Sequence, residues 1–328
     1  MPPLIRFTMG LLPAIACAAH AQSPDPTLDL YAQPGNRIAI SPNRHLNLRC
    51  TGQGSPTVIL ESGNNADSMA WFKVQPAIAT FTRVCSYDRA GTGFSDGGPL
   101  PRNVDSNADD LAALIRAARI ATPVVLVGHS YGTNIVRRFA DAHANEVAAL
   151  VLIDPPPQGV GAFSPEFEKA DAAQRQQMLG ALRHCEQGAE TGKLEPPASD
   201  YKDCLRGPNS AFSAALNTAM RANKIKPAFW QTMISITQTN ADLYRQPVSN
   251  AETHGAIPLL ILQPDTPFED VPPQFRKAME QARQKTHRAI AATSTRGKII
   301  AVAQSSHDVQ IDQPHAVIAA VRTVVHPH

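Results

Sequence analysis

A serine stands between two glycines at residues 128–132, which read GHSYG and match the pattern G-x-S-x-G. The preceding residues 123–128 (PVVLVG) have the composition of a buried strand, and a helical pattern runs from Ser130 to about His143. A tight turn from strand to helix needs small residues, and it exposes the serine hydroxyl above the sheet. The N-terminus of the helix also offers free N–H groups to a developing oxyanion. The motif in this context predicts a nucleophile at Ser130, and a glycine-flanked surface turn is the alternative.

A serine hydroxyl needs a base before it can act as a nucleophile. Among the 11 histidines, His307 follows a predicted strand and lies in the loop SHDVQIDQP, which leads into the last predicted helix. That position brings its imidazole to the same sheet edge as Ser130. His129 is the alternative base, but we expect its side chain to point into the core. Five other histidines fall in helical or insertion patterns and are expected to be solvated: His143, His184, His254, His287 and His315.

A carboxylate must orient the imidazole and stabilise its charged form. Asp154 ends the predicted strand that follows the helix after Ser130, in the run LVLIDPPP. Asp265 and Asp270 follow the next predicted strand. All three residues are expected near the carboxyl edge of the sheet, so the residues alone leave three candidates for the acid.

The elements that must position these groups form a regular alternation of apolar strand runs and helical patterns. This alternation predicts an α/β fold with a mostly parallel central sheet and helices on both faces. Strands are expected at residues 37–40, 45–50, 57–61, 83–87, 123–128, 147–153, 258–262 and 298–303. Helices are expected at residues 69–81, 107–120, 130–143, 273–292 and 313–325.

The alternation breaks at three consecutive prolines, residues 155–157. Residues 155–255 show helices and loops but no strand run, which predicts a helical cap inserted after the sixth strand and lying over the carboxyl edge of the sheet. The core domain would then comprise residues 22–154 and 256–328. The most apolar stretch of the cap, Ile225–Ile236, is expected either to line an acyl site or to form the core of the cap itself.

The first 21 residues have the features of a secretory signal peptide. Arg6 is the only charge before His20, the stretch Phe7–Ala19 is largely apolar, and residues 19–21 (AHA) fit an A-x-A cleavage site. We therefore expect cleavage after Ala21 and export to the periplasm or the medium. A lipoprotein anchor at Cys17 and a buried first helix are the alternatives.

Four cysteines remain after that cleavage, an even number for an oxidising compartment. The members of each proposed pair lie in one local region, which favours the disulfides Cys50–Cys85 and Cys185–Cys204. Four buried thiols are the alternative. The chain has no CxxC pair, so a zinc ribbon or a redox-active dithiol is not expected.

Composition narrows the partners that the protein could have. Lys and Arg number 30 and Asp and Glu number 28, so the net charge of +2 gives no electrostatic reason to expect nucleic acid. No stretch after the signal approaches the ~18 apolar residues that a membrane span requires. The sequence shows no cluster of metal ligands and no glycine-rich phosphate loop, so neither a metal nor a cofactor is predicted.

The chain resembles the α/β-hydrolase family over nearly all of its mature length. The matching stretches are VILESG, YDRAGTGFSD, LVGHSYG, LVLID and SSHDVQIDQP. The resemblance implies that Ser130 is the nucleophile, that His307 is the base, and that Asp88 and Arg89 in the second stretch are structural.

The position of the acid departs from the commoner family pattern. Many members carry it about nine residues after a proline like Pro258, a position that Pro267 occupies here. Other members place it at the tip of the strand that follows the nucleophile's helix, and Asp154 lies 24 residues after Ser130 as that arrangement requires. We predict Asp154 as the acid, with Asp265 as the alternative.

The resemblance also implies an oxyanion hole with two N–H donors. One is the backbone N–H of Tyr131, directly after the nucleophile. The other comes from the loop after residues 57–61, where the family usually has His-Gly and this chain has Ser62-Gly63. By position the donor is Asn64, and its alternative is a solvent-facing loop residue.

A serine nucleophile attacks an acyl carbon and forms an acyl-enzyme that water then cleaves. Epoxide hydrolases and dehalogenases of this fold need a carboxylate nucleophile, so Ser130 argues against both. We predict hydrolysis of a small-molecule carboxylic ester, with an apolar acyl chain as a further hypothesis. The alternatives are an amide or peptide hydrolase of the aminopeptidase type, and a protein that binds a ligand without turnover.

Overall fold

The computed structural model describes residues 25–266, 268 and 271–326. The predicted signal peptide, residues 1–21, and the alternative anchor at Cys17 lie outside the described residues. Within this part of the chain, no helix is long and apolar enough to cross a membrane.

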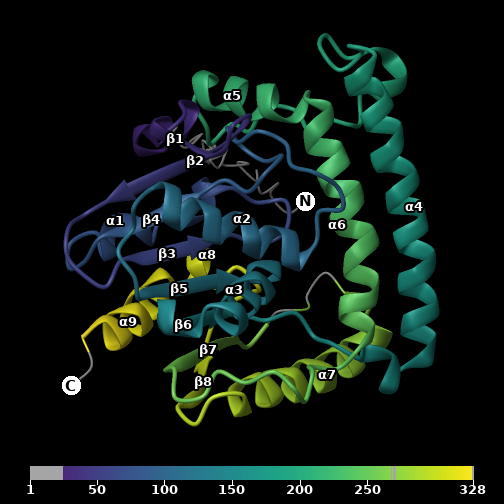
Figure 1. Ribbon diagram of the computed structural model, residues 1–328. Coiled ribbons are helices and arrows are strands. Elements are labelled where there is room, and N and C mark those ends of the chain that lie inside the picture. The colour runs from purple at the N-terminus through teal and green to yellow at the C-terminus, as the bar shows by residue number, and fades with distance from the viewer. Residues whose placement is uncertain (1–24, 267, 269–270, 327–328) are drawn as a thin grey trace, which may run out of the picture.

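Eight strands form one sheet in the order β1-β2-β4-β3-β5-β6-β7-β8 (Figure 1). The strands β1 and β2 are antiparallel to their neighbours, and all pairs from β4 to β8 are parallel. The sheet therefore confirms the predicted α/β class. The strands are β1 (Asn36–Ser41), β2 (Arg44–Thr51), β3 (Val58–Glu61), β4 (Val84–Tyr87), β5 (Val124–His129), β6 (Val147–Ile153), β7 (Leu259–Pro264) and β8 (Gly297–Val302).

Helices cover both faces of the sheet, because successive side chains of a strand point to opposite faces. Ile59, Leu126 and Leu150 face a core shared with α2 and α3. Val58 and Val125 face a second core shared with α1 and α9. The helices are α1 (Gln75–Ile78), α2 (Val104–Ala117), α3 (Tyr131–Ala142), α4 (Pro165–Glu190), α5 (Ala214–Lys224), α6 (Pro227–Arg245), α7 (Pro273–Ala292), α8 (Val309–Asp312) and α9 (Pro314–Val325).

The predicted helix over residues 69–81 is wrong in its extent. The structure has a short 3₁₀ turn at Ser68–Trp71 and then the single-turn helix α1. Pro76 explains the break: it has no N–H to donate, and its ring clashes with the carbonyl one turn earlier in a continuous helix. A proline is tolerated in the first turn of a helix, which is where Pro76 lies in α1.

The segment between β6 and β7 contains α4, α5 and α6 and no strand of the sheet. The helices α4 and α6 lie side by side across the carboxyl ends of the parallel strands (Figure 1). They therefore stand over the edge where the sequence places its candidate site. The division into a core and a separate cap remains a prediction.

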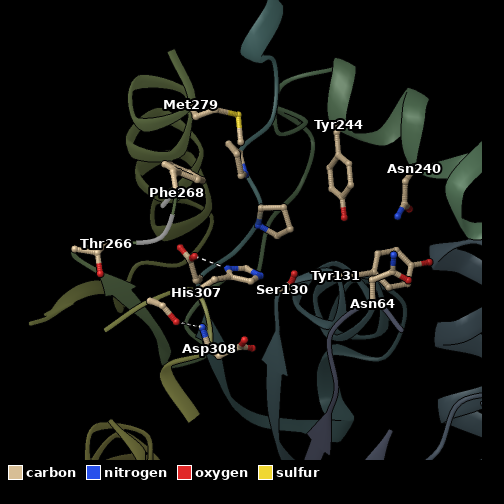
Figure 2. A pocket seen from close by; sticks show the side chains of 14 residues that line it. Asn64, Ser130, Tyr131, Asn240, Tyr244, Thr266, Phe268, Met279, His307 and Asp308 are labelled. Carbon is tan, nitrogen blue, oxygen red and sulfur yellow. Dashed lines mark hydrogen bonds and ion pairs between the residues drawn. The ribbon is translucent and has the colours of Figure 1, made fainter. Parts of the chain in front are cut away.

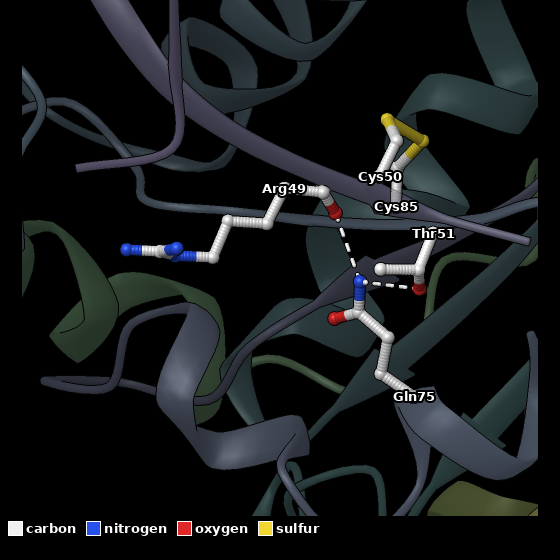
Figure 3. Close-up of a disulfide and its surroundings, with 5 residues drawn as sticks. All are labelled: Arg49, Cys50, Thr51, Gln75 and Cys85. Atoms are coloured by element: carbon white, nitrogen blue, oxygen red, sulfur yellow. Dashed lines mark hydrogen bonds between the residues drawn. A yellow bond between two sulfur atoms is a disulfide. The ribbon is translucent and has the colours of Figure 1, made fainter. Parts of the chain in front are cut away.

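The structure has both predicted disulfides at bonding distance. Cys50 and Cys85 are direct cross-strand partners on β2 and β4, with an S–S distance of 2.05 Å. The side-chain amide of Gln75 donates to the carbonyl of Arg49 at 2.9 Å and so joins α1 to the same strand (Figure 3). The second pair, Cys185–Cys204, links α4 to the loop that follows it.

Candidate active site

Ser130 lies on the turn between β5 and α3 with φ +50° and ψ −124°. A positive φ is uncommon for a residue with a Cβ and is typical of the strained nucleophile turn. Two flanking glycines allow the turn to be this tight. A Cβ on Gly128 would lie 2.8 Å from the carbonyl oxygen of Gly132, and a Cβ on Gly132 would lie 2.6 Å from the carbonyl oxygens of Glu61 and Ser62.

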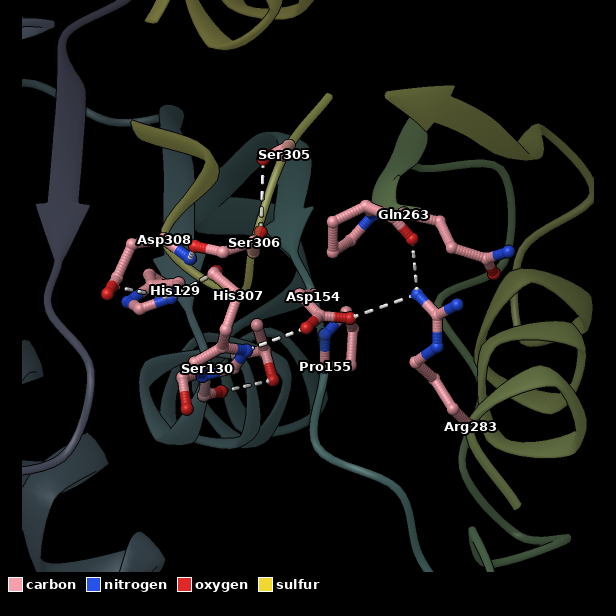
Figure 4. Close-up of polar contacts among 12 residues, drawn as sticks. His129, Ser130, Asp154, Pro155, Gln263, Arg283, Ser305, Ser306, His307 and Asp308 are labelled. Carbon is pink, nitrogen blue, oxygen red and sulfur yellow. Dashed lines mark hydrogen bonds and ion pairs between the residues drawn. The ribbon is translucent and has the colours of Figure 1, made fainter. Parts of the chain in front are cut away.

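His307 and Asp154 meet through a short hydrogen bond. The Nδ1 atom of His307 lies 2.6 Å from Oδ2 of Asp154, which stands at the tip of β6 with φ +41° (Figure 4). Asp154 is buried, whereas the side chain of His307 is 40% exposed. Because Nδ1–H is held by a carboxylate, Nε2 is the nitrogen left to accept a proton.

Two opposing effects set the pKa of His307. Burial lowers the pKa of the imidazole. The hydrogen bond and the charge of Asp154 raise it by a larger amount, so the pKa of His307 lies above its ordinary value. The imidazolium that forms when His307 accepts a proton as a general base is therefore stabilised.

The alternative acid, Asp265, makes different contacts. Its two carboxylate oxygens accept the backbone N–H groups of Gln304 and Ser305 at 2.9 and 3.0 Å. These hydrogen bonds lower the pKa of Asp265, and they hold the loop that leads to His307. The third candidate, Asp270, lies outside the described residues. The structure thus brings Asp154, and not Asp265, to the imidazole.

A buried arginine and a buried histidine on α7 face the other oxygen of Asp154. Nη1 of Arg283 lies 3.6 Å from Oδ1 (Figure 4). Nε2 of His287 lies 3.7 Å from the same oxygen. Neither approach is a hydrogen bond, and Oδ1 accepts none from the described residues. Arg283 is not among the residues predicted from the sequence. The available signal was its four-residue spacing from His287, which puts both on one face of a predicted helix.

The expectation that His287 and His254 are solvated is wrong, because both rings are buried. His287 lies 2.9 Å from the carbonyl oxygen of Pro155 and 2.8 Å from the side-chain oxygen of Gln263, and burial lowers its pKa. Nε2 of His254 lies 3.1 Å from the carboxylate of Glu252. A polar ring enters the interior when neighbouring oxygens satisfy it, and no local pattern reveals those neighbours.

The alternative base, His129, is buried behind His307. Its Nε2 lies 3.0 Å from the carbonyl oxygen of His307, and the two ring centroids are 4.8 Å apart. Burial, together with the charge of His307, lowers the pKa of His129 to about 3. His129 is therefore neutral in ordinary buffers. It supports the loop of His307 through its contact with the carbonyl oxygen of that residue.

Arg89 holds the loop that carries Asn64. Its Nη1 donates to the carbonyl of Ser62 at 2.6 Å and its Nη2 to the carbonyl of Gly63 at 2.5 Å, while Nη1 also pairs with the buried carboxylate of Glu61 at 2.5 Å. The guanidinium carbon lies 5.6 Å from the ring centroid of Tyr131. One side chain therefore contacts both segments that are predicted to form the oxyanion hole.

A cavity of about 500 Å³ joins these groups. Ser130, His307, Asn64 and Tyr131 all line it, and Figure 2 shows their side chains around its floor. The rest of the lining combines apolar and polar groups, namely Asp154, Pro156, Pro157, Asn240, Tyr244, Thr266, Phe268, Met279, Ser306 and Asp308.

The apolar stretch Ile225–Ile236 does not line this cavity. Its large side chains Phe229, Trp230 and Met233 are buried in the same core cluster as Leu126 of the sheet, so they form neither a wall of this cavity nor a core confined to the segment 155–255. The residues of α6 that reach the cavity are Asn240 and Tyr244, further along the helix. Among the residues that the structure describes, no group of three or more His, Cys, Asp or Glu side chains could hold a metal ion.

Comparison with known proteins places this geometry in context. A family model described as "Alpha/beta hydrolase family" matches residues 58–320. The uncharacterized protein YqjL of Bacillus subtilis (strain 168) is 24% identical over 274 residues, which cover 83% of this chain and 85% of that protein.

Solved structures agree in fold. A thermophilic esterase from Thermogutta terrifontis aligns with a TM-score of 0.55 at 20% identity, covering 90% of this chain and 100% of that one. An enol-lactonase from Burkholderia xenovorans LB400 aligns with a TM-score of 0.57 at 18% identity, covering 88% of this chain and 98% of that one. At these identities the likeness shows the fold alone.

Proposed function

The chain belongs to the alpha/beta hydrolase family, and from that premise we propose that it is a serine hydrolase that cleaves a carboxylic ester of a small molecule through an acyl-enzyme. The observation that carries the proposal is the hydrogen bond between Asp154 and His307 at a cavity that Ser130 also lines. Family membership alone does not supply the reaction, because related folds host different chemistries.

In the proposed reaction, Oγ of Ser130 attacks the ester carbonyl carbon while Nε2 of His307 takes its proton. Asp154 stabilises the imidazolium that forms. The backbone N–H groups of Tyr131 and Asn64 bind the oxyanion of the tetrahedral intermediate. His307 then protonates the departing alcohol, and water, activated by the same imidazole, cleaves the acyl-enzyme.

A serine at the nucleophile position favours this reaction over epoxide opening, for which an attacking carboxylate is needed. The supporting geometry is the strained φ of Ser130 and the α3 N-terminus beside it, which no side chain caps. Residues 155–255 are proposed to act as a cap, because Asn240 and Tyr244 of α6 line the cavity from that segment.

We further propose that the protein is exported after cleavage behind Ala21. Two disulfides support this proposal, because such bonds persist in oxidising compartments. N-terminal sequencing of the protein recovered from its producing cells should begin at Gln22, and a first residue of Met1 would contradict the proposal.

The reaction is tested with p-nitrophenyl acetate, butyrate and octanoate, using the chain from Gln22 beside Ser130→Ala. We expect wild-type turnover and a loss of about 10³-fold or more in kcat for the variant. Folded protein that cleaves none of the esters would overturn the proposal. Labelling of Ser130 by an organophosphonate would then separate an amide hydrolase, which is labelled, from a binding protein, which is not.

A further inference from the structure

A second cavity of about 260 Å³ adjoins the first, between α4, α6 and α7. The two cavities have four lining residues in common, Pro156, Pro157, Tyr244 and Met279. Met279 and Tyr244 stand at the far side of the catalytic cavity from the imidazole (Figure 2). These shared residues lie between the two cavities, so a substrate group that extends from Ser130 past them would enter the second cavity.

The lining of the second cavity is largely apolar. Val160 and Phe167 contribute from the chain after β6 and from α4, and Ala172 and Ala241 contribute from facing helices. Apolar walls with few polar groups favour the binding of apolar ligand surface. The small alanine side chains on both α4 and α6 leave the space that a substrate group would fill.

The charged side chains of the lining already have partners. Arg175 pairs with Asp171, and Arg245 pairs with Glu168 at 3.2 Å. The charges of these four residues sum to zero, so the cavity holds no surplus charge for a ligand ion to neutralise. A charged ligand group would lose its hydration and compete with pairs that are already formed, which is unfavourable.

We propose that the second cavity binds an uncharged apolar group of the substrate. The substrate class is then a neutral ester with a bulky apolar part, rather than an ester with a terminal charge. This assignment rests on the proposed ester hydrolysis, and it adds the specificity residues Ala172 and Ala241, which that function does not require.

The kinetic test uses two variants that fill the cavity, Ala172→Phe from the α4 wall and Ala241→Phe from the α6 wall. Ala173→Phe is the matched control, because Ala173 neighbours Ala172 on α4 and is exposed as Ala172 is, but does not line the cavity. Two ratios of kcat/KM are measured. The first compares the octanoate with the acetate ester of the same alcohol, and the second compares octyl acetate with ethyl acetate.

We expect at least one of the two ratios to fall by about tenfold or more in both filling variants and to stay unchanged in the control. The series that responds identifies whether the acyl or the alcohol part enters the cavity. Unchanged ratios in both series would overturn the assignment, and an equal fall in the control would do the same.

Binding to Ser130→Ala separates this assignment from the proposed reaction, since it needs no turnover. Titration calorimetry with octanamide should give a Kd about tenfold weaker in Ser130→Ala/Ala172→Phe than in Ser130→Ala alone. The positively charged 8-aminooctanamide should bind Ser130→Ala more weakly than octanamide. N-octylacetamide, which carries the chain on the alcohol side, is titrated in the same way. If neither amide binds Ser130→Ala more tightly than the double variant, the second site is overturned even if the wild type cleaves esters.

Discussion

Arg89 and Arg283 are both buried guanidinium groups beside the same cavity, and their contacts differ in kind. Arg89 donates at 2.5–2.6 Å to the carbonyls of Ser62 and Gly63 and to the carboxylate of Glu61. Arg283 donates to the carbonyl of Pro264 at 2.8 Å but stays 3.6 Å from Asp154. Arg89 thus fixes the loop on the oxyanion side by directional hydrogen bonds, whereas Arg283 places a positive charge near Asp154 without a hydrogen bond to it.

Arginine thus serves two different purposes beside one cavity. Short, directional bonds fix the position of a loop, and their loss moves atoms. A charge at 3.6 Å without a hydrogen bond changes the energy of protonation states and leaves the geometry largely alone. We therefore expect substitutions on the two sides to change different observables.

The largest effect is expected on the acid side, from the carboxylate that contacts the imidazole directly. Asp154→Asn should lower kcat by about 10³–10⁴-fold, because an amide favours the wrong tautomer of His307. Steady-state kinetics on p-nitrophenyl acetate measures this loss. Asp265→Asn is the matched control, and a larger loss in Asp265→Asn than in Asp154→Asn would transfer the role of the acid to Asp265.

The second effect concerns the oxyanion side. Arg89→Met should lower the free energy of unfolding by about 3–5 kcal/mol, because it leaves the carboxylate of Glu61 buried without its partner. Burial already raises the pKa of Glu61, so the unpaired group becomes protonated as the pH falls. The destabilisation should therefore be larger at pH 8 than at pH 5 in urea unfolding.

A double variant sharpens this expectation. Glu61→Gln combined with Arg89→Met removes both charges and should recover part of the lost stability. Activity should be low in both the single and the double variant, because neither has a guanidinium to hold the loop of Asn64. Full recovery of activity in the double variant would show that Arg89 does not position this loop.

The smallest effect is expected from Arg283. Its charge lowers the pKa of His307 against the stronger influence of Asp154, so Arg283→Gln should raise that pKa. Since the neutral imidazole is the active base, the acidic limb of kcat/KM should move to higher pH, and the loss at pH 6 should stay below about tenfold. A matched pH profile of Arg276→Gln, on the same helix, is the control. A limb that moves to lower pH would contradict the assigned role of the charge.

Much of the fold was predictable because its signals are local. The runs at residues 123–128 and 147–153 are continuous and apolar, as strands covered on both faces must be, and the glycines around Ser130 record a turn that leaves no room for Cβ atoms. The helix predicted at 69–81 failed for an equally local reason, because Pro76 interrupts it.

The remaining details depend on contacts between distant segments. Asp154 and Asp265 both end at the sheet edge, and only the packed loops show that one faces an imidazole while the other binds two backbone amides. Arg283 and His287 lie within a helix of ordinary composition. Their proximity to Asp154 arises from the way α7 packs beside β7, which no spacing along the chain encodes.

The order of functional residues along the chain has a consequence for how the gene can change. Ser130, Asp154 and His307 all lie outside the stretch from residue 156 to residue 245, which supplies every wall of the second cavity except Met279. A single exchange of that coding segment between related genes, with junctions after Pro155 and before β7, would replace nearly the whole second cavity while leaving those three residues unaltered. Recombination could therefore vary what the protein accepts without rebuilding the residues proposed to carry out the reaction.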